Sequence, residues 1–242
     1  MNDRPEFPPL LTGIEAPPGQ AAFDKAVAQA TLGCDGGTVV YAMRDDALEA
    51  ALVLAPECSL ADAMAMVMVA GLGCADALGA LAPPEVGVHL CWPDGIRVNG
   101  ARCGGFRAMA SDRAPDVVPD WIVIGLTLPF MALGGNPGDN PGDNPDQTTL
   151  YEEGCADVLP KALLESWTRH SLTWINRWSD DGMPPIHEAW RAKAHGMGED
   201  ISVTLGGTPH EGVFVGLDER GGLLLRQGAE TNLIPLTDML ET

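Results

Sequence analysis

The chain has 242 residues, 45% of them apolar and 20% charged, which is enough to bury a core without a metal or disulfide staple. Its 34 acidic and 14 basic residues give a formal net charge of −20, which argues against nucleic acid or an anionic membrane surface as a partner. The six cysteines form no CxxC pair, and the N-terminus lacks the apolar core of a signal peptide, so we expect a reduced, cytoplasmic protein.

The first third of the chain predicts two helices and two strands. Residues 1–20 are rich in proline and are expected to be irregular, whereas residues 21–32 have a helical pattern. Buried strands are predicted over residues 37–43 and 50–55, followed by a long apolar helix over residues 60–81 with Ser59 as its N-cap. The uncharged part of that helix has 13 residues, fewer than the roughly 20 that span a bilayer.

Strands and helices also alternate in the middle of the chain. Strands are predicted over residues 85–92 and 121–128, and a hairpin lies between them. The tandem NPGD repeat of residues 134–146 is better explained as a solvated loop than as a calcium site, because its prolines and glycines build no fixed ligand cage. Helices are predicted over residues 161–178 and 185–194.

The C-terminal pattern differs from everything before it. Four short strands, over residues 200–205, 211–217, 222–227 and 232–235, are joined by glycine-rich turns, which is typical of a small β-barrel. We therefore expect two domains, residues 1–196 and residues 197–242. The small domain is expected to pack against the helix that contains Trp167 and Trp174.

The segment of residues 91–106 has the residues best suited to chemistry. Asn99-Gly100 is a strong hairpin signal, because a type I′ turn needs positive φ at both central residues. With this turn Arg97 lies opposite Arg102 and Gly95 lies opposite Gly104. Two like charges directly opposite in a hairpin destabilise it unless something neutralises them, and a bound carboxylate or phosphate would do so.

The same segment allows two interpretations, one in which it binds a ligand and one in which it does not. Gly104-Gly105 would let a flat ligand approach the bare backbone. The alternative is that both arginines point into solvent and pair with the acidic side chains of this protein.

Four segments, in order, resemble biotin–protein ligases. Residues 91–105, CWPDGIRVNGARCGG, are similar to the family pattern K-W-P-N-D followed by G-x-K-x-x-G. Residues 123–128, VIGLTL, resemble the family strand V-I-G-I-G-I-N, and residues 212–226, GVFVGLDERGGLLLR, resemble its C-terminal SH3-like barrel. The text HEAWRAKAHGMGEDISV, residues 187–203, is similar to the lead into that barrel. The resemblance to the biotin/lipoate protein ligase superfamily covers most of the chain.

The resemblance implies a fold and a reaction. The fold is α+β: a mixed β-sheet with helices on one face, as in class II synthetases, and then a small SH3-like β-barrel. In the reaction, biotin and ATP with Mg²⁺ form biotinyl-AMP and release pyrophosphate. The acyl group then passes to a lysine of a biotin carboxyl-carrier domain. A homodimer is expected as one possible partner state, because the sequence itself does not fix the oligomeric state.

The resemblance also implies roles for individual residues. Arg102 stands at the position of the catalytic lysine and, with Arg97, would clamp the carboxylate and the α-phosphate. Asp94 would help to hold the magnesium of MgATP. The ligand pocket would be lined by Trp92, Pro93, Asp94, Gly104, Gly105 and Gly125.

The sequence departs from the family at the residues that matter for catalysis. The glycine- and arginine-rich loop G-R-G-R-x-G is missing after the strand of residues 37–43, and Pro129 replaces a family asparagine. The first hypothesis is therefore a divergent ligase for biotin or a lipoate-like acid, and the second is a catalytically impaired module that binds ligand or carrier protein. A third, weaker hypothesis is an acyltransferase that uses Cys91 or Cys103 as nucleophile.

Overall fold

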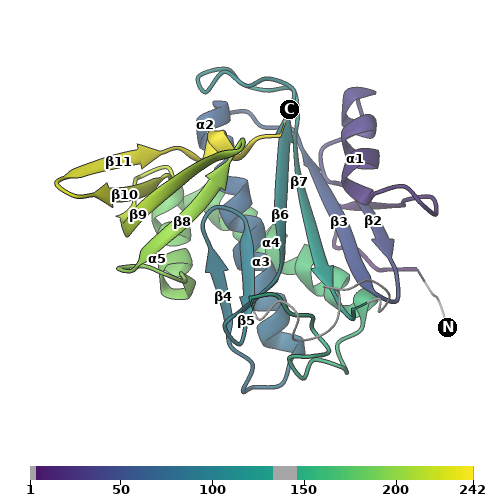
Figure 1. Cartoon of the computed structure of the whole chain (residues 1–242). Coiled ribbons are helices and arrows are strands. Elements are labelled where there is room, and N and C mark those ends of the chain that lie inside the picture. The colour runs from purple at the N-terminus through teal and green to yellow at the C-terminus, as the bar shows by residue number, and fades with distance from the viewer. Residues whose placement is uncertain (1–3, 133–145, 242) are drawn as a thin grey trace.

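The central element is a seven-stranded mixed sheet, seen in a computed structural model that describes residues 4–132 and 146–241 (Figure 1). The strand order is β1-β2-β3-β7-β6-β5-β4, in which β1 is parallel to β2 and the other neighbours are antiparallel. The bounds are β1 (Thr12–Glu15), β2 (Thr38–Met43), β3 (Ala47–Leu54), β4 (Val88–Cys91), β5 (Gly95–Val98), β6 (Ala101–Ala110) and β7 (Ile122–Pro129). The prediction of a mixed sheet is confirmed.

Strand β1 corrects the expectation that residues 1–20 are irregular. It is a four-residue edge strand whose Thr12 pairs with Thr38 of β2. Its residues are largely exposed, so the apolar periodicity that reveals a strand is absent from this segment.

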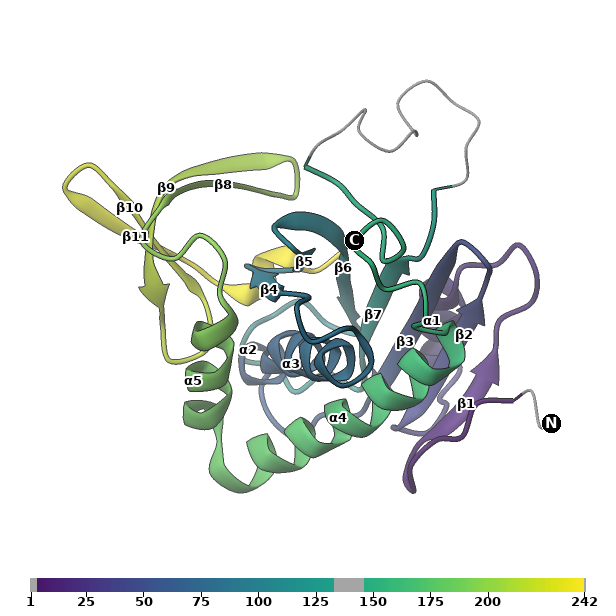
Figure 2. The same ribbon diagram turned by 90° about the horizontal axis from the view of Figure 1, so that it is seen from below.

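Side chains alternate between the two faces of the sheet, and each face has its own core. On one face lie α2 (Leu60–Ala63), α3 (Ala65–Leu81) and α4 (Pro160–Asp181), and Figure 2 shows α3 between the strands and α4. On the other face, α1 (Ala22–Thr31) packs on Val40, Ala51 and Val123. The expectation of helices on one face is therefore wrong for α1, because the strands alternate apolar residues toward both sides.

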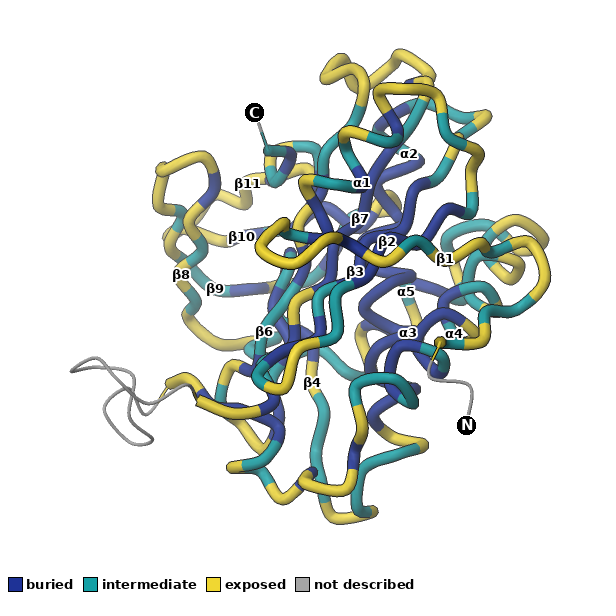
Figure 3. The backbone as a smooth tube through the Cα atoms, turned by 90° about the vertical axis from the view of Figure 1, so that its right-hand side faces the viewer, coloured by how far each residue is buried: buried dark blue, intermediate teal, exposed yellow. Residues whose placement is uncertain are grey.

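Helix α3 is the most deeply buried helix of the sheet domain (Figure 3). Ser59 caps α2 as predicted, because its hydroxyl accepts a hydrogen bond from the amide of Asp62. The helical run Leu60–Leu81 is long and apolar enough to cross a membrane by composition, but 78% of its most apolar window is buried inside the protein. Burial, and not the shortness inferred from the sequence, identifies it as a core helix.

The C-terminal strands form a second, open sheet. After α5 (Met183–Lys193) come β8 (Asp200–Leu205), β9 (Thr208–Leu217), β10 (Leu223–Gln227), β11 (Glu230–Ile234) and a 3₁₀ turn, η1 (Leu236–Met239). The antiparallel order is β11-β10-β9-β8, which fits an SH3-like domain. Within the described residues β8 and β11 do not pair with each other, so the sheet has two free edges and does not close into a barrel.

The small sheet packs on α5 and α3. The rings of Trp190 and Phe214 lie 6.5 Å apart, and the turn at Gly221 sits against Met68. Trp167 and Trp174 of α4 instead donate their indole protons to Ala70 and Asp76 of α3. The predicted packing against the tryptophan-rich helix is therefore replaced by packing on its two neighbours. The NPGD repeat lies almost entirely outside the described residues.

Candidate functional site

The predicted hairpin places two arginines side by side. Asn99 and Gly100 form the turn with φ of 49° and 98°, and Arg97 of β5 is directly opposite Arg102 of β6. The predicted pairing of these two arginines is confirmed. Beyond them Gly95 lies opposite Gly105, not Gly104, because β6 has one extra residue there. The extra residue is accommodated by a β-bulge in which Gly104 has a φ of 84°.

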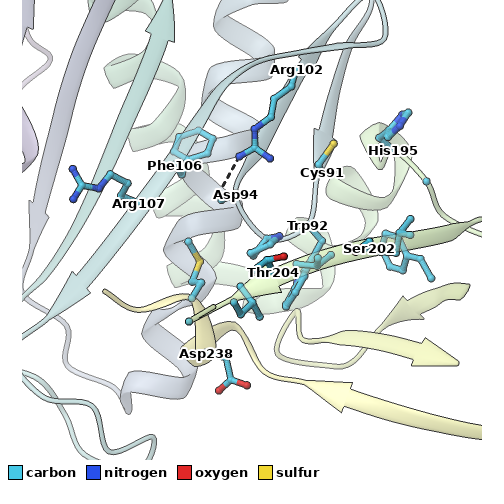
Figure 4. A pocket seen from close by; sticks show the side chains of 18 of the residues that line it. Cys91, Trp92, Asp94, Arg102, Phe106, Arg107, His195, Ser202, Thr204 and Asp238 are labelled. Carbon is cyan, nitrogen blue, oxygen red and sulfur yellow. Dashed lines mark ion pairs between the residues drawn. The ribbon is translucent and has the colours of Figure 1, made fainter. Parts of the chain in front are cut away.

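A cavity of about 1020 Å³ lies between this hairpin and the C-terminal sheet. Five predicted site residues line it, namely Trp92, Pro93, Asp94, Arg97 and Arg102. Three others do not line it, namely Gly104, Gly105 and Gly125. Figure 4 shows Arg102, Asp94 and Trp92 together, with Cys91 and His195 beside them.

The Arg102 side chain pairs with Asp94 and lies beside two glycines, Gly95 and Gly105. A guanidinium nitrogen of Arg102 lies 3.2 Å from Oδ2 of Asp94 (Figure 4). A Cβ at Gly95 or at Gly105 would lie 3.3 Å from the same guanidinium group. At Gly105, one of the two glycines expected to receive a flat ligand, the bare backbone instead lies against the carbonyl oxygen of Asp94 and the Arg102 guanidinium, and the Arg102 side chain is 44% exposed.

Arg97 has no carboxylate partner within ion-pair distance in the described part of the chain. Its Nε donates to Sγ of Cys91 at 3.3 Å, and its Nη1 donates to the carbonyl of Gly100. These contacts fix the side chain without neutralising it. The alternative that both arginines pair with acidic side chains of this protein therefore fails for Arg97. It holds for Arg102, which pairs with Asp94.

Trp92 has a structural contact that its sequence context does not reveal. Its side chain is 4% exposed, and its indole nitrogen donates a 2.8 Å hydrogen bond to the carbonyl of Gly221 in the β9–β10 turn. The Trp-Pro segment thereby ties the hairpin side of the cavity to a turn of the C-terminal sheet.

Gly125 lies under α1 and away from the cavity. A Cβ there would lie 2.4 Å from the ring of Phe23, so the absent side chain makes room for Phe23. The guanidinium of Arg107 lies 4.3 Å from the centroid of the same ring and binds Glu241 through two hydrogen bonds of 2.6 Å. Arg107 lines the cavity as well, although no sequence motif marks it.

The opposite wall comes from the C-terminal sheet, which sequence reasoning did not connect with the site. It consists of residues 199–206, including the whole of β8, together with residues 238–241 around η1. Arg113, just beyond β6, also lines the cavity and donates to the carbonyl of Leu240. Only the packing of the C-terminal sheet against the rest of the chain brings these segments together, so no local signal in the sequence marks them.

The cysteine alternative gains no support from the structure. Burial raises the pKa of the Cys91 thiol, although Arg97 and Arg102 act in the opposite direction. Burial also raises the pKa of Cys103 to about 12, and its side chain lies in the helix-side core, away from Arg102. Neither thiol is activated as a thiolate near neutral pH.

Two further expectations concern the loop and the metal. Strands β2 and β3 are joined by the three residues 44–46, so the expected absence of a glycine- and arginine-rich loop is confirmed. Within the described residues no group of three or more His, Cys, Asp or Glu side chains is arranged to hold a metal. Asp94 alone does not form a magnesium site, so a magnesium ion here would depend on the phosphates of a nucleotide for its other ligands.

Comparison with known proteins identifies relatives of both parts of the chain. The model of the biotin/lipoate A/B protein ligase family matches residues 7–192, and the model of a domain of unknown function, DUF4444, matches residues 197–242. A biotin–[acetyl-CoA-carboxylase] ligase of Paracoccus denitrificans is 30% identical over 188 residues, which cover 78% of this chain and 77% of that protein.

Solved structures agree with this result. A biotin protein ligase-like protein of unknown function from Silicibacter sp. TM1040 is 53% identical, with a TM-score of 0.89 over 99% of this chain and 100% of that chain. The biotin protein ligase of Aquifex aeolicus in complex with biotin and ATP shares the fold, with 19% identity and a TM-score of 0.66 over 93% of this chain and 94% of that one.

Proposed function

Since the chain belongs to the biotin/lipoate A/B protein ligase family, we propose that it activates biotin, or a related acyl acid, with ATP and transfers the acyl group to a lysine of a carrier protein. The observation that carries the proposal is the pair Arg97 and Arg102, which face one cavity from adjacent strands. Two guanidinium groups suit a site where a carboxylate and a phosphate must meet, because each can bind an oxyanion through two hydrogen bonds.

Each residue of the pair has a separate task in this proposal. Arg97, which has no acidic partner among the described residues, would bind the carboxylate or α-phosphate directly. Arg102 would be oriented by Asp94 and would stabilise the negative charge that develops on the α-phosphate oxygens. A carboxylate oxygen of the acid attacks the α-phosphorus of ATP, which forms the acyl–phosphate bond, breaks the bond from the α-phosphorus to the β-phosphate and releases pyrophosphate. Attack by the lysine amine then forms an amide, breaks the acyl–phosphate bond and releases AMP, while the amine proton passes to solvent.

The small sheet would help to exclude water. The cavity has walls from both parts of the chain, and exclusion of water both strengthens electrostatic contacts and protects a reactive acyl intermediate. We therefore propose residues 1–196 as the catalytic domain and residues 197–242 as its SH3-like cover. A cytoplasmic location and a homodimer belong to the same proposal.

A specific observation favours a second candidate function. The three-residue β2–β3 turn leaves no loop that could cover the sheet at that point, and an arginine replaces the family lysine at position 102. A protein with these departures could bind biotin or a carrier domain without activating the acid. This alternative is the catalytically impaired binding module.

Pyrophosphate–ATP exchange separates the two functions. The wild-type chain should exchange label with biotin, lipoate or octanoate above the blank without acid, and Arg102→Ala should abolish the difference. Arg177→Ala, which removes an exposed arginine from α4, should leave the exchange unchanged. No exchange together with biotin binding by calorimetry would favour the binding module, and the absence of both would refute the proposal.

A further inference from the structure

The charges in the cavity are segregated between its two walls. The wall formed by β5, β6 and the following segment contains four arginines, namely Arg97, Arg102, Arg107 and Arg113. The C-terminal wall contains four acids, namely Glu199, Asp200, Asp238 and Glu241. Asp94 is the exception on the first wall, and it is paired with Arg102. A cavity of this kind is suited to an anion on one wall and to a cation on the other.

Three of the four acids are free to meet a cation. Glu241 binds Arg107, but Glu199, Asp200 and Asp238 are exposed and form no ion pair with a lysine or arginine among the described residues. The pKa of His195 is lowered overall, by burial and by the charge of Arg97. The carboxylate of Glu199 acts in the opposite direction. The acidic wall therefore keeps negative charge opposite the arginines.

The same wall has the free edge of a strand. Every residue of β8 lines the cavity, which means that the strand faces the cavity along its length (Figure 4). In the described chain β8 pairs only with β9, through a hairpin closed by Leu205 and Thr208 around Gly206-Gly207. Figure 4 shows Ser202 and Thr204 on this strand, across the cavity from Arg102.

The hairpin register identifies which backbone groups are free. In an antiparallel pair, hydrogen-bonded and non-hydrogen-bonded residue pairs alternate, and the pair that closes a two-residue turn is hydrogen-bonded. Counting from Leu205, the N–H and C=O groups of Asp200, Ser202 and Thr204 point away from β9. Pro209 lies opposite Thr204, at a pair where its missing N–H costs no bond.

We propose that the free edge of β8 binds an extended, lysine-bearing segment of the acceptor protein. The segment adds a strand to the small sheet, and its backbone pairs with Asp200, Ser202 and Thr204. Its ammonium group approaches from the acidic wall and faces the arginine wall. The lysine in this inference rests on the proposed function, whereas the strand edge and the charge segregation come from the cavity itself.

Proline substitution tests the edge without breaking the sheet. Ser202→Pro removes one free N–H from β8 and leaves its bonds to β9 in place. The matched control is Thr231→Pro in β11. Gln227 and Glu230 close the β10–β11 hairpin, so the N–H of Thr231, one residue further along, points away from β10 to the other free edge of this sheet. Thr231 does not line the cavity. Both variants introduce the same backbone restriction into an edge strand.

The probe is an unbiotinylated biotin carboxyl-carrier domain, and its binding is measured by calorimetry. Ser202→Pro should raise the Kd at least tenfold, and Thr231→Pro should change it less than twofold. Asp200→Asn, which leaves the backbone unchanged, should also weaken binding, and more at low salt than at high salt. With wild-type protein, the carrier domain should slow hydrogen exchange at the amides of Ser202 and Thr204.

The outcomes separate this inference from the proposed function. Pyrophosphate exchange reports acyl activation and does not involve the carrier, so its absence would refute the ligase and not the docking edge. Wild-type protein that does not bind the carrier domain, or amides of β8 that stay unprotected, would overturn the docking proposal. It would also be overturned by equal Kd values for Ser202→Pro and wild type, or by a dimer of this chain paired through β8.

Discussion

The indole nitrogen of Trp92 donates a buried 2.8 Å hydrogen bond to the carbonyl of Gly221, which lies 129 residues further along the chain. Gly221 itself has a φ of 84°, and a Cβ there would lie 2.3 Å from the sulfur of Met68. Asp218 fixes the same turn by accepting hydrogen bonds from the amides of Arg220 and Gly222. Trp92 therefore positions the C-terminal wall of the cavity through this turn.

Trp92→Phe tests this positioning role. The change removes one N–H and leaves a buried carbonyl without its partner, so it should destabilise the protein by about 1–3 kcal/mol. Hydrogen exchange should also become faster in β8–β11. The matched control is Trp167→Phe, which removes a buried indole bond of 3.1 Å to Ala70 within the helical layer. Similar exchange patterns for the two variants would contradict the role of Trp92.

Gly95 stands where the pattern K-W-P-N-D has its aspartate, and the hairpin should not accept a side chain there. Any Cβ there would lie 2.8 Å from Cβ of Cys91 and would crowd the Arg102 guanidinium. Gly95→Ala should therefore destabilise the protein by about 1–3 kcal/mol in urea unfolding. Gly79→Ala is the control, since a Cβ there meets nothing within 4 Å and alanine favours the helix. Equal free energies of unfolding for the two variants would show that the hairpin can adapt.

The contact between Gly125 and Phe23 predicts strong coupling between the two positions. Gly125→Ala should cost about 1–3 kcal/mol, because the new Cβ would lie 2.4 Å from an aromatic carbon of a buried ring. In a Phe23→Ala background the same change should cost much less, since the colliding ring is gone. Thermal or urea unfolding of the four proteins of this cycle gives the coupling, and additive free energies would contradict the contact.

The reactivity of Cys91 should follow its buried environment. Burial raises the pKa of this thiol, so less thiolate is present at a given pH and alkylation by iodoacetamide should be slower at pH 8 than for a small free thiol. Arg97→Gln should slow the reaction further, because the guanidinium that favours the thiolate is removed. Mass spectrometry can follow this site against pH, with Arg177→Gln as the control. A midpoint below that of a free thiol would show an activated cysteine.

The sequence predicts the hairpin well because its determinants are local. Asn99-Gly100 needs only its own backbone preferences to turn, and alternation then places Arg97 opposite Arg102. The bulge at Gly104 depends on a neighbour that the hairpin does not contain: a Cβ there would lie 2.1 Å from the carbonyl oxygen of Thr127 in β7. The register beyond the arginines was therefore outside the reach of a local argument.

The roles of individual glycines were harder to predict for the same reason. A glycine in a motif can receive a ligand or a side chain of its own protein, and the sequence does not distinguish the two. A Cβ at Gly105 would lie 2.4 Å from the carbonyl oxygen of Asp94 and 3.3 Å from the Arg102 guanidinium, and a Cβ at Gly125 would lie 2.4 Å from the ring of Phe23. The acidic wall cannot be predicted from the sequence, because β8 reaches the cavity only through long-range packing of the two sheets, which no periodicity encodes.

The hydrophobic core is continuous across the two parts of the chain that match separate family models, as the contact between Trp190 and Phe214 illustrates. Met68 and Trp190 pack against Gly221 and Phe214 of the small sheet, so the two parts of the chain should unfold in one cooperative thermal transition. The small sheet therefore cannot be replaced by another domain without changes elsewhere in the chain. A relative that replaced it would also have to change the helix surfaces beneath it, so the two parts are constrained to evolve together.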